Sequence, residues 1–489
     1  MRDYHVSVMA VFSRLVREYM RDAPPTVHPA TKCGEALLIM RKFPASSIVI
    51  TTPSGRPIGI LTEQDVVRRI AFLNPSSTSV AEVMTSPLKI IHDEDYLFHG
   101  IAIMQRSGLR HLPVVDRFGN LTGILNLHDV LAGLGTRIMD LIERLMHDET
   151  PEGLRLVKKA EAEVAAALLK DSIPATEIQT LLTQINNDIY SRVQAIILTE
   201  LTEEGWGGPP VEFDMIVMGA GGRGESFLFP DQDNGFILTD YPDKQHATVD
   251  SYFIEVADRM SVMLNAVGFP RCRGYVMAIN PTWRKGLSQW YIQIDNWLEK
   301  PNQTTLRYID IFFDFQHIIG REDLATRLRK HVTGAIRQNH VFLREMQLVQ
   351  QGHGVALGRF GRLTPEQDSP HKGKINLKYQ GLLPLVESVR LLALREGINE
   401  TATLGRIEAL HTSGILSQDE KDSLSNAFHN LTTLILRQQI QDFKDELQVT
   451  AYVSADSLSR SEKDGLIDSL RAINELRGRV HAEFTGDVF

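Results

Sequence analysis

The sequence predicts a multidomain protein that combines α/β domains with all-α regions. At 489 residues the chain is too long for one hydrophobic core and corresponds to about three domains. An internal repeat of strand-and-helix units fills its first part, and a strand-like run ending in a glycine-rich loop lies near its middle. Helical periodicity dominates the rest. We predict an N-terminal helix, the repeated pair, a helical connector that packs on the next domain, a central α/β domain and a helical C-terminal domain, over residues 1–21, 22–136, 137–205, 206–335 and 336–489.

The composition is that of an ordinary soluble globular protein, with 43% hydrophobic and 23% charged residues. The net charge of −9 argues against a general nucleic-acid-binding role, which requires a basic surface. Two cysteines, Cys33 and Cys272, are too few for a disulfide framework and indicate a reducing compartment. No apolar run reaches membrane-spanning length, and the amphipathic N-terminus lacks a signal-peptide cleavage site. We therefore expect a cytoplasmic protein.

The internal repeat has an offset of 64 residues, because residues 55–70 (GRPIGILTEQDVVRRI) align with residues 119–134 (GNLTGILNLHDVLAGL). Upstream, SSIVITTPSG aligns with RHLPVVDRFG. Each unit reads as helix, strand, turn, strand, helix, with glycine in each turn. The two units therefore predict one duplicated α+β module.

Two copies of G-I-L-x-x-x-D entering a helix resemble a tandem CBS pair. The resemblance implies a disc with two clefts that commonly bind adenosine nucleotides, and a homodimer formed through the disc. In that family the acidic residue contacts ribose hydroxyls, and a Thr or Ser three residues earlier contacts phosphate. Carried over, the first unit supplies Thr62 and Asp65, and the second supplies Asp129, with Asn126 in place of the hydroxyl residue.

Two further points concern the predicted clefts. Arg110 and His111 lie where a bound phosphate could be met. The alternative for Asp65 and Asp129 is that they simply cap helices, because Asp is favoured at such positions.

The connector that follows shows apolar residues at three- and four-residue spacings and no catalytic constellation, so we expect its helices to pack on the central domain.

The central domain is organised around residues 213–240, FDMIVMGAGGRGESFLFPDQDNGFILTD. A strand-like run ends in four glycines around Arg223, and glycine lets a backbone approach a ligand closely. Asp231 and Asp233 open a second strand-like run. Since alternate strand residues point to one face, the two carboxylates should lie together near a loop that can bind phosphate. This is the arrangement that a Mg²⁺-nucleotide requires. We expect Glu225 to orient Arg223.

The combination resembles the nucleotidyltransferase superfamily of DNA polymerase β type, whose sheet is mixed. The longer form, G-S-x-G-R-x-E followed by D-Q-D-N, is similar to the transferase region of PII-protein uridylyltransferases and to a family of nucleotidyltransferases that follow CBS pairs. The resemblance implies that Asp231 and Asp233 hold Mg²⁺ or Mn²⁺. It also implies a nucleotide-binding set of Gly219, Ala220, Gly222, Arg223 and Glu225.

A third carboxylate is implied downstream, where LRYIDIFFDFQHIIG resembles the family's I-F-F-D-x-R strand. The resemblance implies that Asp314, which matches the motif, joins the catalytic and metal-binding carboxylates, with Asp310 in reserve. Residues four apart in an extended strand face the same way. The alternative for Asp314 is a salt-bridged structural residue. Two positions depart from the pattern: Ala220 replaces a serine that helps to hold phosphates, and Gln316 replaces the arginine.

Cys272 begins a second matching segment, C-x-G-x-V-M-A-x-N-P-x-W-R, and is interpreted as a buried small residue because no activating partner adjoins it. Further on, K-x-x-G-L-L-P-L-V-x-x-x-R resembles the family's C-terminal helical substrate-binding domain. Lys378 and Arg390 in this motif could reach the nucleotide, or they are surface or interdomain charges.

These observations leave two functions open. The first is a CBS-regulated nucleotidyltransferase that transfers a nucleoside monophosphate from an NTP to the hydroxyl of a protein, as in PII uridylylation, or of a small molecule, with release of pyrophosphate. The second is a nucleotide-sensing signalling protein with weakened catalysis, and it is motivated by Ala220 and Gln316. The sequence identifies neither the NTP nor the acceptor.

Overall fold

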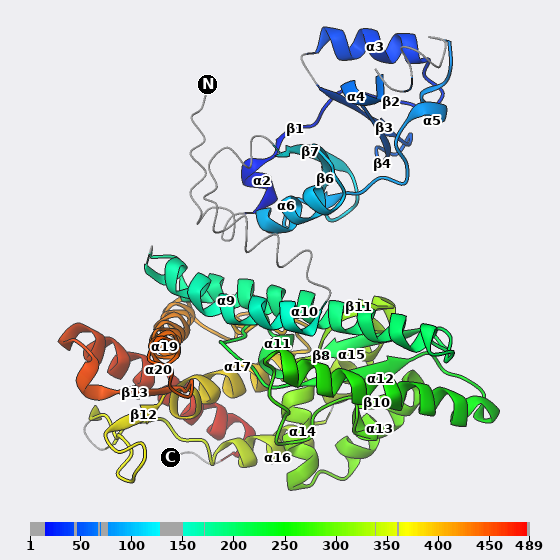
Figure 1. Ribbon diagram of the computed structural model, residues 1–489. Helices are drawn as coiled ribbons and strands as arrows, with labels where there is room; N and C mark the ends of the chain where they lie inside the picture. Colours follow the sequence, from blue (N-terminus) through cyan, green and yellow to red (C-terminus); the bar gives the residue numbers. More distant parts are fainter. Residues whose placement is uncertain are drawn as a thin grey trace. The chain divides into compact units, whose positions relative to one another are not determined.

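The computed structural model of the protein describes residues 15–43, 46–66, 69, 77–127, 150–170, 172–337, 339–358 and 361–486 (Figure 1). The chain divides into two compact units, Met1–Asp148 and Glu149–Phe489. Residues 1–14 of the N-terminal helix predicted over residues 1–21 lie outside the described ranges. The remainder contains the short helix α2 (Val16–Tyr19), and the strand β1 (Arg21–Asp22) begins at its last residue. Within the described ranges, none of the helices combines the length and apolar character needed to traverse a lipid bilayer.

The first unit contains the predicted repeat as two hairpins in equivalent register. Ser47 pairs with Thr62 in one hairpin and His111 pairs with Asn126 in the other, which preserves the 64-residue offset of the sequence. In each half a further strand pairs parallel to the hairpin, giving the sheets β2-β3-β4 and β1-β7-β6-β5. The strands are β2 (Thr26–Val27), β3 (Ser47–Thr51), β4 (Pro57–Thr62), β5 (Ile91–His92), β6 (His111–Val115) and β7 (Leu121–Asn126).

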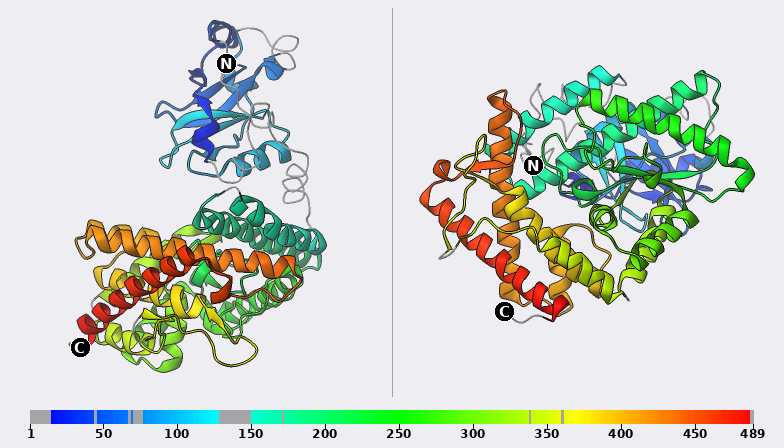
Figure 2. Two further views of the ribbon diagram at one scale, coloured as in Figure 1. Left: turned by 90° about the vertical axis from the view of Figure 1, so that its left-hand side faces the viewer. Right: turned by 90° about the horizontal axis from the view of Figure 1, so that it is seen from below.

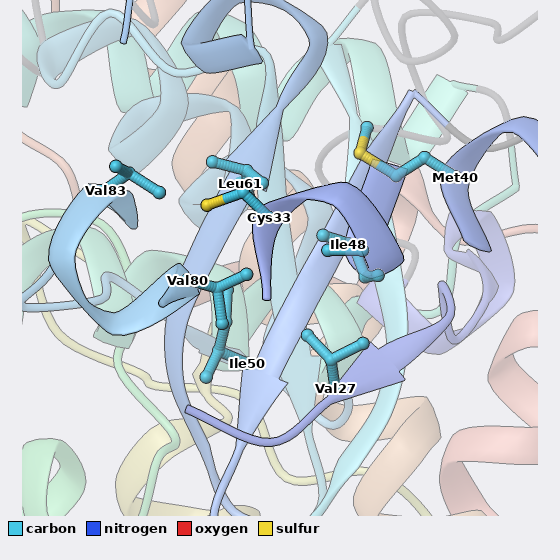
Figure 3. Close-up of a cluster of buried hydrophobic side chains, with 9 residues drawn as sticks. Val27, Cys33, Met40, Ile48, Ile50, Leu61, Val80 and Val83 are labelled. Atoms are coloured by element: carbon cyan, nitrogen blue, oxygen red, sulfur yellow. The ribbon is translucent and has the colours of Figure 1, made fainter. Parts of the chain in front are cut away.

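Alternating apolar strand residues and one face of a helix form the core of the first half. Helix α3 (Cys33–Lys42) contributes Cys33 and Met40, which pack against strand residues such as Ile48 and against helix α5 (Val80–Val83) (Figure 3). The short helix α4 (Glu63–Asp65) follows β4, and α6 (Leu97–Arg106) packs on β6 in the second half. The glycine in each hairpin turn has a positive φ, +82° at Gly55 and +83° at Gly119, which explains the repeated glycine.

The second unit is built around a mixed sheet of order β10-β9-β8-β11, in which only β9 and β10 are parallel. Every residue of β8 and β9 is buried, which is typical of strands covered on both faces. Helix α15 packs on the sheet, while α9 and α10 pack on each other and on α12. The elements are β8 (Phe213–Val217), β9 (Asn234–Leu238), β10 (Arg284–Gly286), β11 (Gln316–Gly320), α9 (Pro151–Lys170), α10 (Ala175–Glu203), α12 (His246–Val267), α13 (Leu287–Glu299) and α15 (Glu322–Arg337).

The regular elements of the C-terminal part, among the described residues, are mainly helices, together with a two-stranded ribbon of β12 (Lys374–Asn376) and β13 (Tyr452–Ser454). Its long helices α19 and α20 lie side by side (Figure 2), and the almost fully buried α17 packs against α20. The helices are α16 (His340–Gln350), α17 (Leu383–Glu396), α18 (Thr403–Thr412), α19 (Gln418–Lys444) and α20 (Arg460–Thr485).

Candidate functional site

The glycine-rich stretch after β8 forms one tight helical turn, α11 (Gly219–Gly222), against the loop that contains Asp314. A Cβ atom at Gly222 would lie 1.6 Å from the carbonyl oxygen of Asp314, so only glycine fits at that position. Gly219 has φ +60°, and a Cβ atom there would lie 3.2 Å from Asp233 Oδ2. The glycines therefore let this turn approach two acidic residues closely.

Asp231 and Asp233 line the same cavities, as their alternation in the sequence predicts. Between them, Gln232 is fully buried and donates through Nε2 to the carbonyl oxygens of Ser261, at 3.1 Å, and Phe269, at 2.8 Å. The residues on either side of Gln232 consequently face away from the core. The aspartates precede β9 rather than belonging to it.

Asp233 has no ion-pair partner within 4.0 Å among the described residues, although Lys378 and Arg223 lie close enough to act on its pKa. Its Oδ1 is buried without a hydrogen-bond partner. Burial and the charge of Asp231 raise the pKa of Asp233 to about 7. Asp231, Asp233 and Cys272 each offer one ligand atom, and these three atoms lie within 4.8 Å of one another. Two carboxylates with an orphaned buried oxygen fit a divalent cation. Burial and the Asp233 charge raise the pKa of Cys272 to about 12.

The carboxylate pair lies where two cavities adjoin. The larger cavity, of about 490 Å³, is rich in aromatic rings and side-chain amides, among them Tyr190, Phe229, Tyr452, Asn186 and Gln439. The smaller cavity, of about 320 Å³, combines apolar side chains with many charged and polar ones, among them Asp310, Arg307, His353, Glu387 and Gln350. Both cavities share Ala220, Asp231, Asp233, Lys378 and Tyr379.

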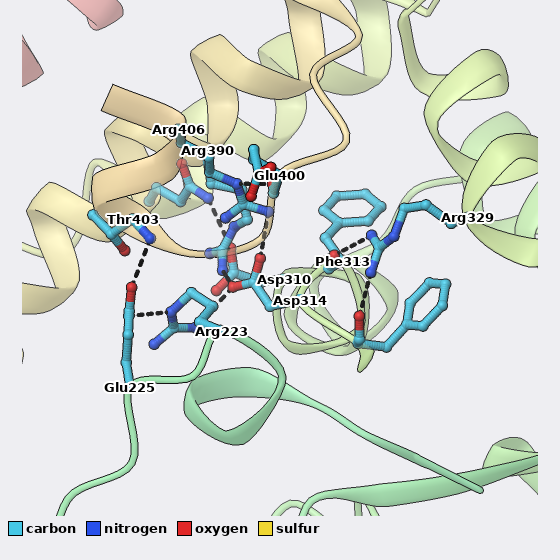
Figure 4. Close-up of polar contacts among 12 residues, drawn as sticks. Arg223, Glu225, Asp310, Phe313, Asp314, Arg329, Arg390, Glu400, Thr403 and Arg406 are labelled. Carbon is cyan, nitrogen blue, oxygen red and sulfur yellow. Dashed lines mark hydrogen bonds and ion pairs between the residues drawn. The ribbon is translucent and has the colours of Figure 1, made fainter. Parts of the chain in front are cut away.

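Asp314 lies at the centre of an arginine cluster (Figure 4). Arg223 Nη1 and Arg390 Nη1 donate to its Oδ2 at 2.7 and 2.6 Å, and Arg406 Nη2 lies 2.7 Å from its Oδ1. Glu225 completes the cluster, because its Oε2 accepts from Arg223 Nε at 2.6 Å and its Oε1 accepts from the backbone N–H of Thr403 at 2.6 Å. The predicted interaction of Glu225 with Arg223 is therefore present.

These contacts fit the salt-bridged alternative for Asp314 better than a metal-ligand role. The Asp314 side chain is fully buried and lines neither cavity. Burial would raise the pKa of its carboxyl, but Arg406, Arg390 and Arg223 together hold that pKa well below its usual range. Asp314 joins the glycine turn to α17, which contains Arg390, and to α18, which contains Arg406.

The predicted strand through Asp310 and Asp314 is wrong. Residues Gln303–Phe312 form helix α14, and Asp314 lies in the turn before β11. Asn302 caps the helix, and its buried residues Leu306, Ile309 and Phe312 recur at helical rather than strand spacing. Asp310, the reserve residue, lines the smaller cavity together with Asp231 and Asp233. It accepts from Gln350 Nε2 at 2.8 Å and also binds Arg390 Nη2.

Sequence reasoning missed several polar residues at this site. Arg406 belongs to a segment without a recognisable motif, and Glu387 occupies an unspecified position of the K-x-x-G-L-L-P-L-V-x-x-x-R motif, so only folding shows that both lie near the site. His353 Nδ1 lies 2.9 Å from Glu387 Oε1, and both residues line the smaller cavity. Cys272 did offer a signal, because it begins a matching motif, although the sequence indicated only a buried small residue. Lys378, which was predicted to reach either nucleotide or surface, lines both cavities.

In the first unit, Thr62 and Asp65 form a capping box. The Thr62 hydroxyl donates to Asp65 Oδ2 at 2.7 Å and accepts from the Asp65 backbone N–H at 3.3 Å, as the capping alternative predicts. His111 lines a cleft of about 910 Å³ together with Asn126, whereas the exposed Arg110 does not line it. Asp129 lies outside the described residues.

Family models match most of the chain. Residues 159–304 match the family described as "Putative nucleotidyltransferase DUF294", and residues 340–484 match "Putative nucleotidyltransferase substrate binding domain". Residues 16–72 and 80–135 each match the CBS domain. The first two matches include the glycine turn, the carboxylate pair and the helices that supply Arg390 and Arg406.

Individual relatives match shorter segments. An uncharacterized protein of Methanopyrus kandleri is 30% identical over 118 residues, which are 24% of this chain and 60% of that protein. Inosine-5′-monophosphate dehydrogenase of Aquifex aeolicus is 32% identical over 111 residues, which are 22% of each chain. The chain thus spans less than two thirds of these curated relatives. A solved CBS domain protein from Pyrobaculum aerophilum, complexed with AMP, is 21% identical and matches over 26% of this chain and 98% of that one, with a TM-score of 0.24.

Proposed function

Because the chain belongs to the family in which a CBS pair accompanies a nucleotidyltransferase region and its substrate-binding domain, we propose that it transfers a nucleoside monophosphate from an NTP to an acceptor hydroxyl. The acceptor oxygen forms a bond to the α-phosphorus, the bond from that phosphorus to the bridging oxygen breaks, and pyrophosphate leaves. The observation that carries the proposal is the carboxylate pair Asp231 and Asp233 at the junction of two cavities. A two-substrate transfer requires such a junction.

We assign the nucleotide to the larger cavity and the acceptor to the smaller one. An exposed aromatic face such as that of Tyr379 suits stacking with a base, which contributes about 1–3 kcal/mol. Side-chain amides such as that of Asn376 can hydrogen-bond the edge of the base. Lys378 lines both cavities, so its ammonium can neutralise phosphate charge at the junction.

Asp231 and Asp233 would hold the divalent cation, and we propose Asp310 rather than Asp314 as the third carboxylate. Asp310 lines the cavity that contains the pair, whereas the oxygens of Asp314 are engaged by arginines. Bound Mg²⁺ would stabilise the charge that develops on the phosphate oxygens. Arg390 forms ion pairs with both Asp310 and Asp314. It therefore connects Asp310, in the cavity assigned to the acceptor, with the arginine cluster around Asp314. Asp310 is positioned to receive the proton of the acceptor hydroxyl.

The test is transfer of label from α-labelled ATP, UTP, CTP or GTP to components of a cell extract in the presence of Mg²⁺. Label should appear in a protein or small-molecule product, with equimolar pyrophosphate. An Asp231→Asn/Asp233→Asn variant controls for other enzymes in the extract. A wild-type signal no greater than that of this variant would sink the enzymatic proposal for the acceptors present.

For the CBS pair we propose an adenosine nucleotide as the regulatory ligand. The 910 Å³ cleft lined by His111 and Asn126 is large enough for one, and Ser46 and Ser47 add hydroxyl groups to its wall. Calorimetry with AMP and ATP should show binding that weakens in a His111→Ala variant. Equal affinity in the variant and the wild type would exclude this cleft.

The second candidate function is nucleotide sensing without turnover. Ala220, which lines both cavities, offers no hydroxyl to the phosphates, and Asp310 is already bound to Arg390. Tight nucleotide binding without pyrophosphate release in the labelling experiment would favour this function over transfer.

A further inference from the structure

Cys272 lies beside the carboxylate pair because of how two chain segments meet. Gln232 forms a parallel bridge with Arg271, and its backbone N–H donates to the carbonyl oxygen of Pro270 at 2.9 Å. Asp233 and Cys272, which each follow a bridged residue, are therefore neighbours across the two segments. The Cys272 side chain is 7% exposed, and its Sγ lies within 4.8 Å of a carboxylate oxygen of each aspartate.

The donor set has the chemistry of a mixed site. Mg²⁺ selects oxygen ligands, whereas Zn²⁺, Co²⁺ and Cd²⁺ also accept thiolate sulfur. We propose that Cys272 is a further protein ligand at the Asp231–Asp233 site, so that this site accepts, besides the Mg²⁺ assigned to it above, a thiophilic divalent cation of the Zn²⁺ or Co²⁺ class through one sulfur and two carboxylate oxygens. The inference rests on the proposed function for the metal role of the two aspartates, but it does not depend on turnover.

Two further observations support a cation at this position. Asp233 Oδ1 is buried and has no hydrogen-bond partner, so one carboxylate oxygen remains available to a ligand. Among the described residues, neither aspartate forms an ion pair with a lysine or arginine within 4.0 Å, although Lys378 lines the same cavities. A buried carboxylate oxygen that lacks a hydrogen bond is costly, and a bound cation removes that cost.

The binding step is a simple exchange. The S–H bond of Cys272 breaks, its proton passes to solvent, and a metal–sulfur bond forms while the metal keeps its oxidation state. Asp231 and Asp233 each contribute one oxygen. The remaining coordination positions are available to phosphate oxygens or water, as in metal sites that keep open positions.

The experiment uses the full chain freed of metal by chelation and then titrated with Cd²⁺ or Co²⁺. A thiolate-to-metal charge-transfer band should grow and saturate at one equivalent. Cys33 offers a matched control, because it is the other cysteine of the sequence and is buried in the first unit. The band should persist in Cys33→Ser and vanish in Cys272→Ser. It should also be lost in Asp231→Asn/Asp233→Asn.

Cys272→Ser should weaken Cd²⁺ binding by about a hundredfold or more, since changes even outside the ligand shell cost about 10–100-fold. Persistence of the band in Cys272→Ser, or its absence in wild type, would overturn the inference. If the variant fails to fold, X-ray absorption of Co²⁺-loaded wild type decides instead: one sulfur neighbour supports the site, and an all-oxygen shell overturns it.

The outcomes also separate this inference from the proposed function. A saturable thiolate band in a protein that transfers no nucleotide supports the metal site and contradicts the transferase proposal. Nucleotidyl transfer with Mg²⁺ in a protein that shows no thiolate band supports the transferase and contradicts the role of Cys272.

Discussion

Asp233 and Asp314 are two carboxylates of the same unit with opposite surroundings. Asp314 is fully buried, and three guanidinium groups lie within 2.7 Å of its oxygens. Asp233 has another aspartate as its neighbour, and one of its oxygens is buried without a hydrogen bond and, unlike the oxygens of Asp314, without an ion pair among the described residues. The pKa of Asp314 accordingly lies well below the usual range, whereas that of Asp233 is raised to about 7.

This difference indicates a structural role for the Asp314 carboxylate and a ligand-binding role for the Asp233 carboxylate. Around Asp314 the chain supplies its own cations, from the glycine turn, α17 and α18, and so uses the carboxylate to join three segments. Around Asp233 it supplies no ion-pair partner among the described residues, and the cavities leave room for one. Unmatched charge at a cavity wall is a better indicator of a binding site than charge alone.

The largest effect should follow from neutralising the unmatched pair. Asp231→Asn/Asp233→Asn should reduce label transfer about a thousandfold to ten-thousandfold, because a bound cation contributes several kcal/mol of transition-state stabilisation. The fold should remain intact, since the change removes repulsion between like charges. Transfer rates and circular dichroism check both parts. Normal transfer by the variant would show that the pair is not the cation site.

Neutralising Asp314, the carboxylate paired with arginines, should lower the stability of the fold instead. Asp314→Asn leaves three buried guanidinium groups without their shared partner, and breaking a buried pair costs about 3–5 kcal/mol. Urea unfolding followed by tryptophan fluorescence reports this unit alone, because all four tryptophans lie at residue 206 or beyond.

The matched control for Asp314 is Asp468→Asn, which breaks the exposed pair with Arg471. Its expected cost is about 0–1 kcal/mol, as for other surface pairs. Equal costs for the two variants would contradict the idea that the arginine cluster holds the domain segments together.

The contributions of Asp233 and Asp314 to folding stability should also depend on pH in opposite directions. The folded pKa of Asp233, about 7, exceeds its usual 3.8, so the metal-free folded state binds an extra proton between these values and loses stability as pH rises through them. Asp314 has a lowered pKa, so its contribution is present above pH 4 and lost as pH falls below it. Asp233→Asn should therefore gain about 1–2 kcal/mol relative to wild type between pH 5 and pH 8, after allowance for partial exposure. Urea unfolding in chelator at both pH values measures this difference.

The sequence pattern predicted strand register and local side-chain orientation better than it predicted which distant residues contact one another. The 64-residue repeat gave the correct hairpin register, and the alternation around Gln232 gave the common orientation of Asp231 and Asp233, because both depend on local periodicity. The role of Asp314 depends on Arg390 and Arg406, which lie 76 or more residues away and meet it only through helix packing. The prediction of a strand around Asp310 was wrong because a short apolar run fits both the helical and the strand periodicity.

Lys378 should contribute a smaller effect, on nucleotide binding. It is exposed and lines both cavities beside Asp233, so its ammonium can meet a phosphate without disturbing the fold. Lys378→Ala should weaken nucleotide binding about tenfold, which corresponds to one charge-assisted hydrogen bond. Lys372→Ala is the matched control, since Lys372 is exposed on the same segment but lines neither cavity. Calorimetry showing equal affinities for the two variants would remove Lys378 from the site.

The smallest expected effect is a gain. Ala220 lies in the glycine turn, lines both cavities and replaces a hydroxyl residue of the related pattern. A neutral hydrogen bond contributes about 0.5–1.5 kcal/mol, so Ala220→Ser should raise nucleotide affinity or transfer rate by roughly two- to tenfold. A gain in transfer rate would mean that the site is a transferase limited by one missing donor. A gain in affinity without transfer would support sensing, because completing the phosphate contacts would not restore chemistry. Parallel calorimetry and label-transfer assays on this variant distinguish the two functions at the position where the sequence departs from its family.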